Sequence, residues 1–203
     1  MTADPAVPAH PAATVVLLRD SDEGCEVLLV RRSSRLAFHG GAWVFPGGRI
    51  DAVDYGTTAA EAEIRAAACQ AAVREAQEEA GIAVDPAELV LFSRWVTPEG
   101  LPKRFDAWFF AARAPFSPVQ VDGGEIEEHR WISPAEALAA REAGEIELPP
   151  PTFVTLTKFR GAEAVADVLA ALRAEPLRSY VPHLHLLTGG GACSLYDGDA
   201  GYE

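Results

Sequence analysis

Residues 74–82 read Arg-Glu-Ala-Gln-Glu-Glu-Ala-Gly-Ile, and this stretch says most about the fold and its chemistry. On a helix, Glu75, Glu78 and Glu79 share one face, because residues three and four apart are neighbours. Three carboxylates gathered on one face repel each other and add nothing to stability. Hard divalent cations such as Mg²⁺ bind oxygen ligands, so this face predicts a metal site. Gly81 follows at the position where helices commonly end in a left-handed conformation.

Strands and helices are expected on both sides of this stretch. A long Ala-rich helix is predicted to run from about Thr58, where Thr58 and Glu61 form a capping-box pattern, to Ala80. Apolar runs predict strands, and Pro and Gly mark the turns between them. The remaining strands are expected at residues 14–18, 26–31, 42–45, 89–96, 105–112, 129–132 and 182–187, and helices at residues 135–142, 152–159 and 163–173. This order predicts an α/β fold, a mixed sheet with helices covering both faces.

Composition suggests how the 203 residues are organised. Residues 1–13 are rich in Ala and Pro and lack an apolar core, so we expect a flexible tail and not a signal peptide. Residues 14–148 are expected to form the main domain. Residues 149–203 follow the proline run at 149–151 and are expected to form a helical extension packed on the same domain. With 49% hydrophobic residues, the chain can bury a sizeable core.

Charge and cysteine content narrow the function classes. A net charge of −13 argues against binding to nucleic acid or to an anionic membrane, both of which need a basic surface. The three cysteines, Cys25, Cys69 and Cys193, are widely spaced and form no CxxC pair, which predicts neither disulfide nor zinc site and a reduced, cytoplasmic setting. No run approaches the roughly 18 apolar residues of a membrane-spanning helix. We therefore expect a small-molecule substrate, and leave a homodimer open.

The stretch at 74–82 and the Phe-Pro-Gly-Gly run at 45–48 together resemble the signature of the Nudix hydrolases. That signature places a glycine, a glutamate and then Arg-Glu-x-x-Glu-Glu-x-Gly on a loop–helix–loop. The resemblance spans about residues 14–145 and implies a Nudix-type α/β/α sandwich. It also implies an enzyme that uses Mg²⁺ or Mn²⁺ to hydrolyse the diphosphate of a nucleoside diphosphate linked to a further group X.

The resemblance and the chemistry of diphosphate cleavage suggest a role for each residue of the motif. Metal ions on Glu75, Glu78 and Glu79 would neutralise phosphate oxygens and lower the pKa of a bound water. Gly48 lacks a side chain, so its backbone can approach the metal closely. Arg74 lies one turn before Glu78, a spacing suited to an ion pair that orients the carboxylates. Glu78, Glu79 and Arg74 are therefore predicted to act in catalysis.

The family also carries a glutamate shortly before a strand tryptophan in the second half of the fold. Glu125, six residues before Trp131, fits this position. We predict that Glu125 acts as a metal ligand or general base, with Glu128 as the alternative.

The chain departs from the family pattern between its glycine and its arginine. The family separates these residues by fourteen positions, whereas Gly48 and Arg74 are twenty-six apart. Eight positions before Arg74, where the family's first glutamate belongs, the chain has Ala66, and Glu61 and Glu63 are out of register. The role of that first acid is left unassigned.

Residues 28–51 suggest the substrate. Their Leu-Leu, Arg-Ser, His and Gly positions before Phe-Pro-Gly-Gly resemble the coenzyme A diphosphatase branch, although Val30 and Ala37 replace its threonine and arginine. Arg31, Arg32 and Arg35 supply the local cations that an acidic protein needs to hold a 3′-phosphate and a diphosphate. The alternative is that these arginines only prevent a strand end from pairing with another chain. The residues expected to bind substrate are Arg32, Arg35, His39 and Arg49.

Coenzyme A or an acyl-CoA is thus the favoured substrate. Four alternatives keep the chemistry and change X: ADP-ribose, NADH, a nucleotide sugar or an oxidised nucleoside triphosphate. A further alternative belongs to another class, a Nudix fold that binds nucleotides as a sensor without catalysis.

Overall fold

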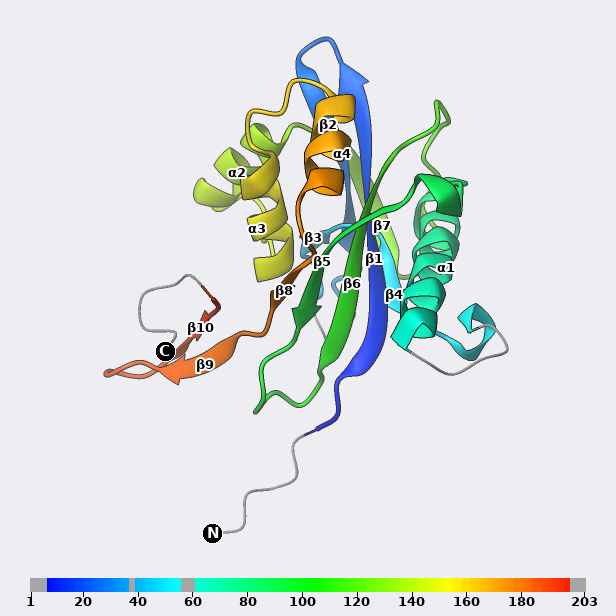
Figure 1. The fold of residues 1–203 in the computed structure, drawn as a ribbon. Coiled ribbons are helices and arrows are strands. Elements are labelled where there is room, and N and C mark those ends of the chain that lie inside the picture. Colours follow the sequence, from blue (N-terminus) through cyan, green and yellow to red (C-terminus); the bar gives the residue numbers. More distant parts are fainter. Residues whose placement is uncertain (1–6, 37–38, 56–60, 198–203) are drawn as a thin grey trace.

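The computed structural model describes residues 7–36, 39–55 and 61–197 (Figure 1). The order of elements alternates strands and helices, with two short 3₁₀ helices, η1 and η2. Along the chain they are β1 (His10–Ser21), β2 (Gly24–Arg32), β3 (Trp43–Val44), β4 (Gly47–Arg49), η1 (Ala52–Asp54), α1 (Glu61–Ala80), η2 (Pro86–Glu88), β5 (Val90–Val96), β6 (Phe105–Arg113), β7 (Ile126–Ile132), α2 (Pro134–Glu142), α3 (Pro150–Phe159), α4 (Val165–Ala174), β8 (Arg178–Tyr180), β9 (His183–Leu186) and β10 (Ala192–Leu195).

The main sheet is mixed, with the order β3-β2-β1-β6-β5-β8. β4 also pairs with β1, and β7 also pairs with β2. β1 runs parallel to β6, and β5 runs parallel to β8, while β1–β2, β1–β4, β2–β7 and β5–β6 are antiparallel. β9 and β10 form a separate two-stranded sheet.

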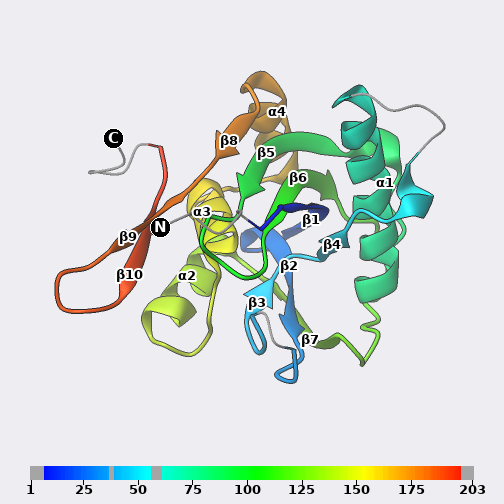
Figure 2. The same cartoon turned by 90° about the horizontal axis from the view of Figure 1, so that it is seen from below.

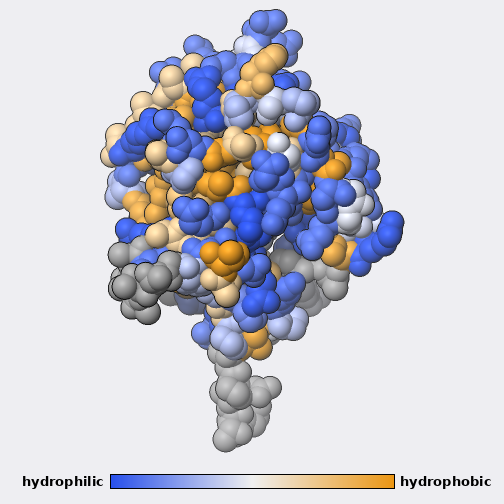
Figure 3. Space-filling view, turned by 90° about the vertical axis from the view of Figure 1, so that its right-hand side faces the viewer, coloured by the Kyte–Doolittle hydropathy of each residue, from blue (hydrophilic) through white to orange (hydrophobic). Residues whose placement is uncertain are grey.

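Helices cover both faces of the main sheet, so the predicted α/β/α sandwich is confirmed (Figure 1). Successive β1 side chains point to opposite faces: Val15 and Leu17 pack against α1, whereas Val16 and Leu18 pack on the side of α2, α3 and α4. All four of these side chains are fully buried, as in the central strands of sheets covered on both sides. The face that carries α1 is mostly hydrophilic, with scattered apolar residues (Figure 3).

Several predicted boundaries differ from the structure. β1 begins at His10, four residues before the predicted start, because residues 10–13 pair with β6 and β4. Pro46, Gly47 and Gly48 were predicted to form a sharp turn, but both glycines belong to strand β4. The pairing depends on glycine, since a Cβ atom on Gly47 would lie 2.5 Å from the Ala13 carbonyl oxygen. β7 begins at Ile126, three residues early, and β8 and β10 were not predicted. Thr58, the proposed helix cap, lies outside the described residues.

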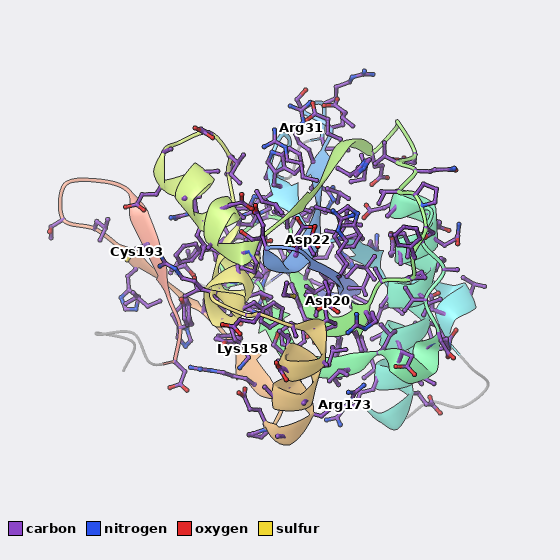
Figure 4. The ribbon with its side chains drawn as sticks, turned by 90° about the horizontal axis from the view of Figure 1, so that it is seen from above. Asp20, Asp22, Arg31, Lys158, Arg173 and Cys193 are labelled. Carbon is purple, nitrogen blue, oxygen red and sulfur yellow. The ribbon has the colours of Figure 1, made fainter. Side chains whose placement is uncertain are left out.

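The region after residue 149 contributes to the same core as the strands. Leu156 and Phe159 of α3 and Val165 and Leu169 of α4 are buried against β-strand side chains. The N-cap residue of α4 is an alanine, which cannot accept a hydrogen bond through its side chain. Asp20 at the end of β1 caps the helix instead, because its Oδ1 accepts the Val165 N–H at 2.8 Å (Figure 4). None of the helices within the described residues is both long and apolar enough to cross a membrane.

Candidate active site

The second half of α1 presents its carboxylates to β4. Four alanines on the inner face, Ala71, Ala72, Ala76 and Ala80, let the helix lie close to the sheet. Glu75 and Glu79 belong to that inner side and are 8% and 6% exposed. Glu78 lies on the outer side, and its side chain is 58% exposed. α1 ends as predicted, with Gly81 in the left-handed region at φ 67°.

The two glycines of β4 allow backbone and carboxylate to meet. The Gly47 N–H donates to Glu79 Oε2 at 2.9 Å. A Cβ atom on Gly48 would lie 2.2 Å from Glu75 Oε1, inside any permitted contact distance. Only glycine therefore fits at position 48 while Glu75 keeps its place.

The positive groups around Glu75 and Glu79 do not offset the cost of burying their carboxylates. Burial raises the pKa of Glu79 to about 8, although the Gly47 N–H and the charge of Arg32 work against the shift. Burial also raises the pKa of Glu75, and Arg74 only partly offsets it. A buried carboxylate pair with this imbalance favours a nearby cation.

Arg74 joins the acidic side chains around the site. Its Nη1 donates to Glu75 Oε1 and to Glu78 Oε2, both at 2.8 Å, so the expected Arg74–Glu78 ion pair is present. Its Nε and Nη2 donate to the two oxygens of Asp54 at 3.1 and 3.0 Å. Nη2 also donates to the Arg49 carbonyl oxygen at 2.9 Å. Arg74 thereby fixes α1 to η1 and to the end of β4.

Asp54 is the site residue that the sequence analysis missed. It is 7% exposed, and its Oδ2 also accepts from the Asp51 N–H at 2.8 Å. It is the sixth residue after Gly48, which is the place of the first acid when the family pattern is counted forward from the glycine. The insertion therefore follows Asp54, and counting backward from Arg74 ran through the insertion to Ala66.

We expect Asp54→Ala to lower kcat roughly tenfold to a hundredfold, the usual cost of removing a residue that orients metal ligands. Arg74 would lose its bidentate partner and hold Glu75 and Glu78 less firmly. Mn²⁺ affinity, measured by electron paramagnetic resonance, should weaken in parallel. Asp85→Ala provides the control, since Asp85 caps η2 by accepting from Ala87. Equal losses in the two variants would contradict the role given to Asp54.

Glu125 approaches the same carboxylates from the loop before β7. Its backbone is held at both ends: the Ser33 N–H donates to its carbonyl oxygen at 2.7 Å, and its own N–H donates to Asp122 Oδ2 at 2.9 Å. Its charge is close enough to raise the pKa of both Glu75 and Glu79. Glu128, the alternative candidate, instead pairs with Arg31 at 2.7 Å on β2.

Arg32 and His39 come from the end of β2 and from the segment that follows it. Arg32 ends β2, and its positive charge opposes the rise in the pKa of Glu79 and adds to the lowering of the pKa of His39. Its Nε is buried and has no hydrogen-bond partner in the part of the chain that the structure describes. His39 has a left-handed backbone (φ 51°), and its Nδ1 lies 3.8 Å from Glu147 Oε1. Burial lowers the pKa of His39.

The other two predicted substrate residues are more peripheral. Arg49 is exposed, with its Nη2 3.3 Å from His10 Nδ1. Arg35 is exposed on the loop after β2. Ala37, one of the departures from the coenzyme A motif, lies outside the described residues.

The residues present fit a divalent cation, although they do not enclose one. Within residues 7–36, 39–55 and 61–197, no three His, Cys, Asp or Glu side chains converge into a finished metal cage. Arg74 Nη1 lies between Glu75 and Glu78 and supplies positive charge there. The side-chain-free cradle at Gly48 and the excess negative charge of Glu75 and Glu79 are both features that a hard cation would satisfy.

The fold and this motif define a class of protein. The family model described as NUDIX domain matches residues 8–151, which is more than half of the chain, and the chain belongs to the Nudix family. Among its relatives is the human acyl-coenzyme A diphosphatase NUDT19, 34% identical over 118 residues, which make up 55% of this chain and 31% of that protein. This chain thus spans about a third of the length of that relative.

Solved structures agree on the fold. The crystal structure of a NUDIX hydrolase from Alicyclobacillus acidocaldarius has a TM-score of 0.73 at 23% identity and covers 83% of this chain and 99% of its own. The NUDIX domain of Shewanella oneidensis NrtR, solved with ADP ribose, has a TM-score of 0.58 at 17% identity and covers 78% and 92%. At these identities the likeness concerns the fold alone.

Proposed function

We propose that this chain is a Nudix diphosphohydrolase that depends on Mg²⁺ or Mn²⁺ and cleaves the diphosphate of coenzyme A or an acyl-CoA. One observation carries the proposal: Glu75 and Glu79 are buried beside a glycine cradle, with Glu125 and the Arg32 guanidinium close by. An arrangement of this kind suits a bound cation and a bound diphosphate together.

The metal would be held by Glu75, Glu78 and Glu79 and by the backbone at Gly48. When bound, the cation supplies charge neutralisation for the phosphate oxygens and lowers the pKa of a water. Arg74 contributes indirectly, because Asp54 and the Arg49 carbonyl keep its guanidinium beside two of the metal ligands. It is a positioning residue in this scheme.

The remaining residues act on substrate and water. Glu125, on the loop before β7, is proposed to accept the proton of the attacking water. Arg32 is proposed to bind a diphosphate oxygen, since its charge acts on Glu79 and its Nε is buried with no partner among the described residues. His39, Arg35 and Arg49 extend this cationic region and are proposed to contact the rest of the nucleotide.

Coenzyme A is favoured among substrates by the motif at residues 28–48 and by the name of the human relative. Hydrolysis would give 3′,5′-ADP and a 4′-phosphopantetheine, with the acyl group still attached in the case of an acyl-CoA. A cytoplasmic setting is proposed from the cysteines, since Cys25, Cys69 and Cys193 are all free thiols.

A substrate panel tests this proposal. Coenzyme A, an acyl-CoA, ADP-ribose, NADH, a nucleotide sugar and a nucleoside triphosphate are incubated with the protein in Mg²⁺ or Mn²⁺, and the products are separated by chromatography and identified by mass. We expect 3′,5′-ADP from coenzyme A at the highest kcat/KM. Brisk turnover of ADP-ribose without coenzyme A cleavage would overturn the substrate, and ligand binding without any turnover would indicate a sensor.

A further inference from the structure

The C-terminal arm, defined here as residues 181–196, extends away from the helices and the main sheet (Figures 1 and 2). β9 and β10 pair antiparallel within it, with Cys193 opposite His185 and Ser194 opposite Leu184. The strands are joined by a turn in which Gly189, Gly190 and Gly191 all have positive φ angles, from 93° to 119°. A two-stranded sheet by itself is only marginally stable in water.

The base of the arm is fixed on the main sheet by aromatic rings. Tyr180, at the end of β8, stacks on Trp95 of β5 with ring centroids 4.0 Å apart. Tyr196, just after β10, meets both rings edge-on, at 5.6 Å from Trp95 and 5.5 Å from Tyr180. Both ends of the arm are thus held at one place, while the strands between them extend outward.

The arm also differs from the rest of the surface in its chemistry. Leu184 and Leu187 are 39% and 52% exposed. All thirty Asp and Glu residues of the chain lie outside residues 176–196. The protein has a net charge of −13, so two copies repel each other over most of their surfaces. The arm carries no carboxylates, so two copies can meet there without that repulsion.

Within residues 7–36, 39–55 and 61–197, one edge of β10 has no strand paired with it. Of the strands that the structure describes, only β9 pairs with β10. The four residues of β10, Ala192, Cys193, Ser194 and Leu195, include no charge and no proline, the features that normally prevent an edge strand from pairing with another chain. Such an edge readily accepts a further strand.

We propose that this arm binds the arm of a second copy of this chain. Two β10 edges would pair antiparallel across a twofold axis and join the hairpins into a four-stranded sheet, which is more stable than either hairpin alone. Two identical strand edges are complementary to each other under twofold symmetry. The acidic remainder of each copy, outside the arm, would stay apart from that of its partner. Cys193, in the middle of β10 and labelled in Figure 4, would come close to its symmetry mate.

The molar mass of the full chain in solution tests the proposal. Sedimentation equilibrium from about 1 to 100 µM should give twice the chain mass of 21.6 kDa at the upper concentrations. Cys193→Lys with Leu195→Lys, which places two charges on β10, should give a monomer with an unchanged circular dichroism spectrum. Phe116→Asp, which changes an exposed apolar side chain on another loop, should remain a dimer. A monomeric wild type, or a dimer that survives the double substitution, would overturn the proposal.

A cross-linking experiment tests which edge pairs. In a Cys69→Ser background, a short bismaleimide should join the two Cys193 thiols, because Cys25 is buried. The dimer band should disappear when Cys193→Ser is added. Dimers in solution without this cross-link would overturn pairing through β10. Sedimentation of a monomer with anionic phospholipid vesicles would show that the arm binds lipid instead, and would overturn the proposal as well.

Discussion

Replacing Glu79 with glutamine is expected to lower kcat about a thousandfold or more while the fold remains intact. Glutamine keeps the size of the side chain, and its amide oxygen can still accept the Gly47 N–H bond now made by Glu79 Oε2. It removes the negative charge that a divalent cation requires. Steady-state kinetics on the best substrate of the panel, with circular dichroism as a check on folding, measures the effect.

Two further variants show whether the loss is specific. Glu78→Gln should also reduce turnover by orders of magnitude, although Glu78 is largely exposed and contributes little to the core. Glu88→Gln, on exposed η2, should leave kcat unchanged. Mn²⁺ titrations should show weaker binding to Glu79→Gln and Glu78→Gln than to wild type. Glu88→Gln should bind Mn²⁺ as wild type does. Near wild-type rates in Glu78→Gln or Glu79→Gln would refute the assignment of these residues as metal ligands.

The sequence predicted the parts of this fold whose signal is local. The strands at residues 26–31, 89–96 and 105–112 lie within one or two residues of β2, β5 and β6, because continuous apolar or β-branched runs are buried on both sheet faces. α2 begins at Pro134, one residue before the predicted start, and its N-cap Ser133 accepts the Glu136 N–H through the side-chain hydroxyl. In these cases neighbouring residues alone determine the structure.

The misses depend on partners that are distant in sequence. The Gly47–Arg49 strand exists only because β1 offers an edge to it, so its glycines indicated a turn when considered alone. Asp54 fits the family spacing when it is counted forward from Gly48, and its contact with the guanidinium of Arg74, twenty positions further on, assigns it to the site. The lengths of short edge strands such as β8, which pairs with Ser93, Arg94 and Trp95, likewise depend on tertiary contacts. The insertion lies between Asp54 and Arg74, so counting the family spacing backward from Arg74 leads to Ala66 instead of Asp54.

The metal-free protein should become less stable as pH rises from about 5 to 8, with Glu79 as a principal cause. Burial raises the pKa of Glu79 from 4.5 to about 8 in the folded state. A carboxyl group with a raised folded pKa stabilises the fold while it is protonated, and this contribution is lost as pH rises through the folded value. Loss of this contribution costs on the order of 5 kcal/mol, at about 1.4 kcal/mol for each pKa unit. Glu79→Gln should remove this pH dependence, because its amide stays neutral.

Thermal unfolding in a chelator from pH 5 to pH 9 measures this contribution. The Tm of Glu79→Gln should exceed that of wild type by roughly 5 °C or more at pH 8.5, and the difference should shrink towards pH 5. Other carboxyl groups with lowered pKa values, such as Asp20 and Asp122, oppose the trend in both proteins and cancel in the difference. Glu88→Gln, on the exposed helix η2, should follow wild type. Mg²⁺ added at pH 8.5 should raise the Tm of wild type and not that of Glu79→Gln, since a ligand that binds only the folded state stabilises it.

Parallel curves for wild type and Glu79→Gln across the whole pH range would mean that the buried carboxylate is already balanced by protein groups. That result would remove the electrostatic reason for a metal at this position.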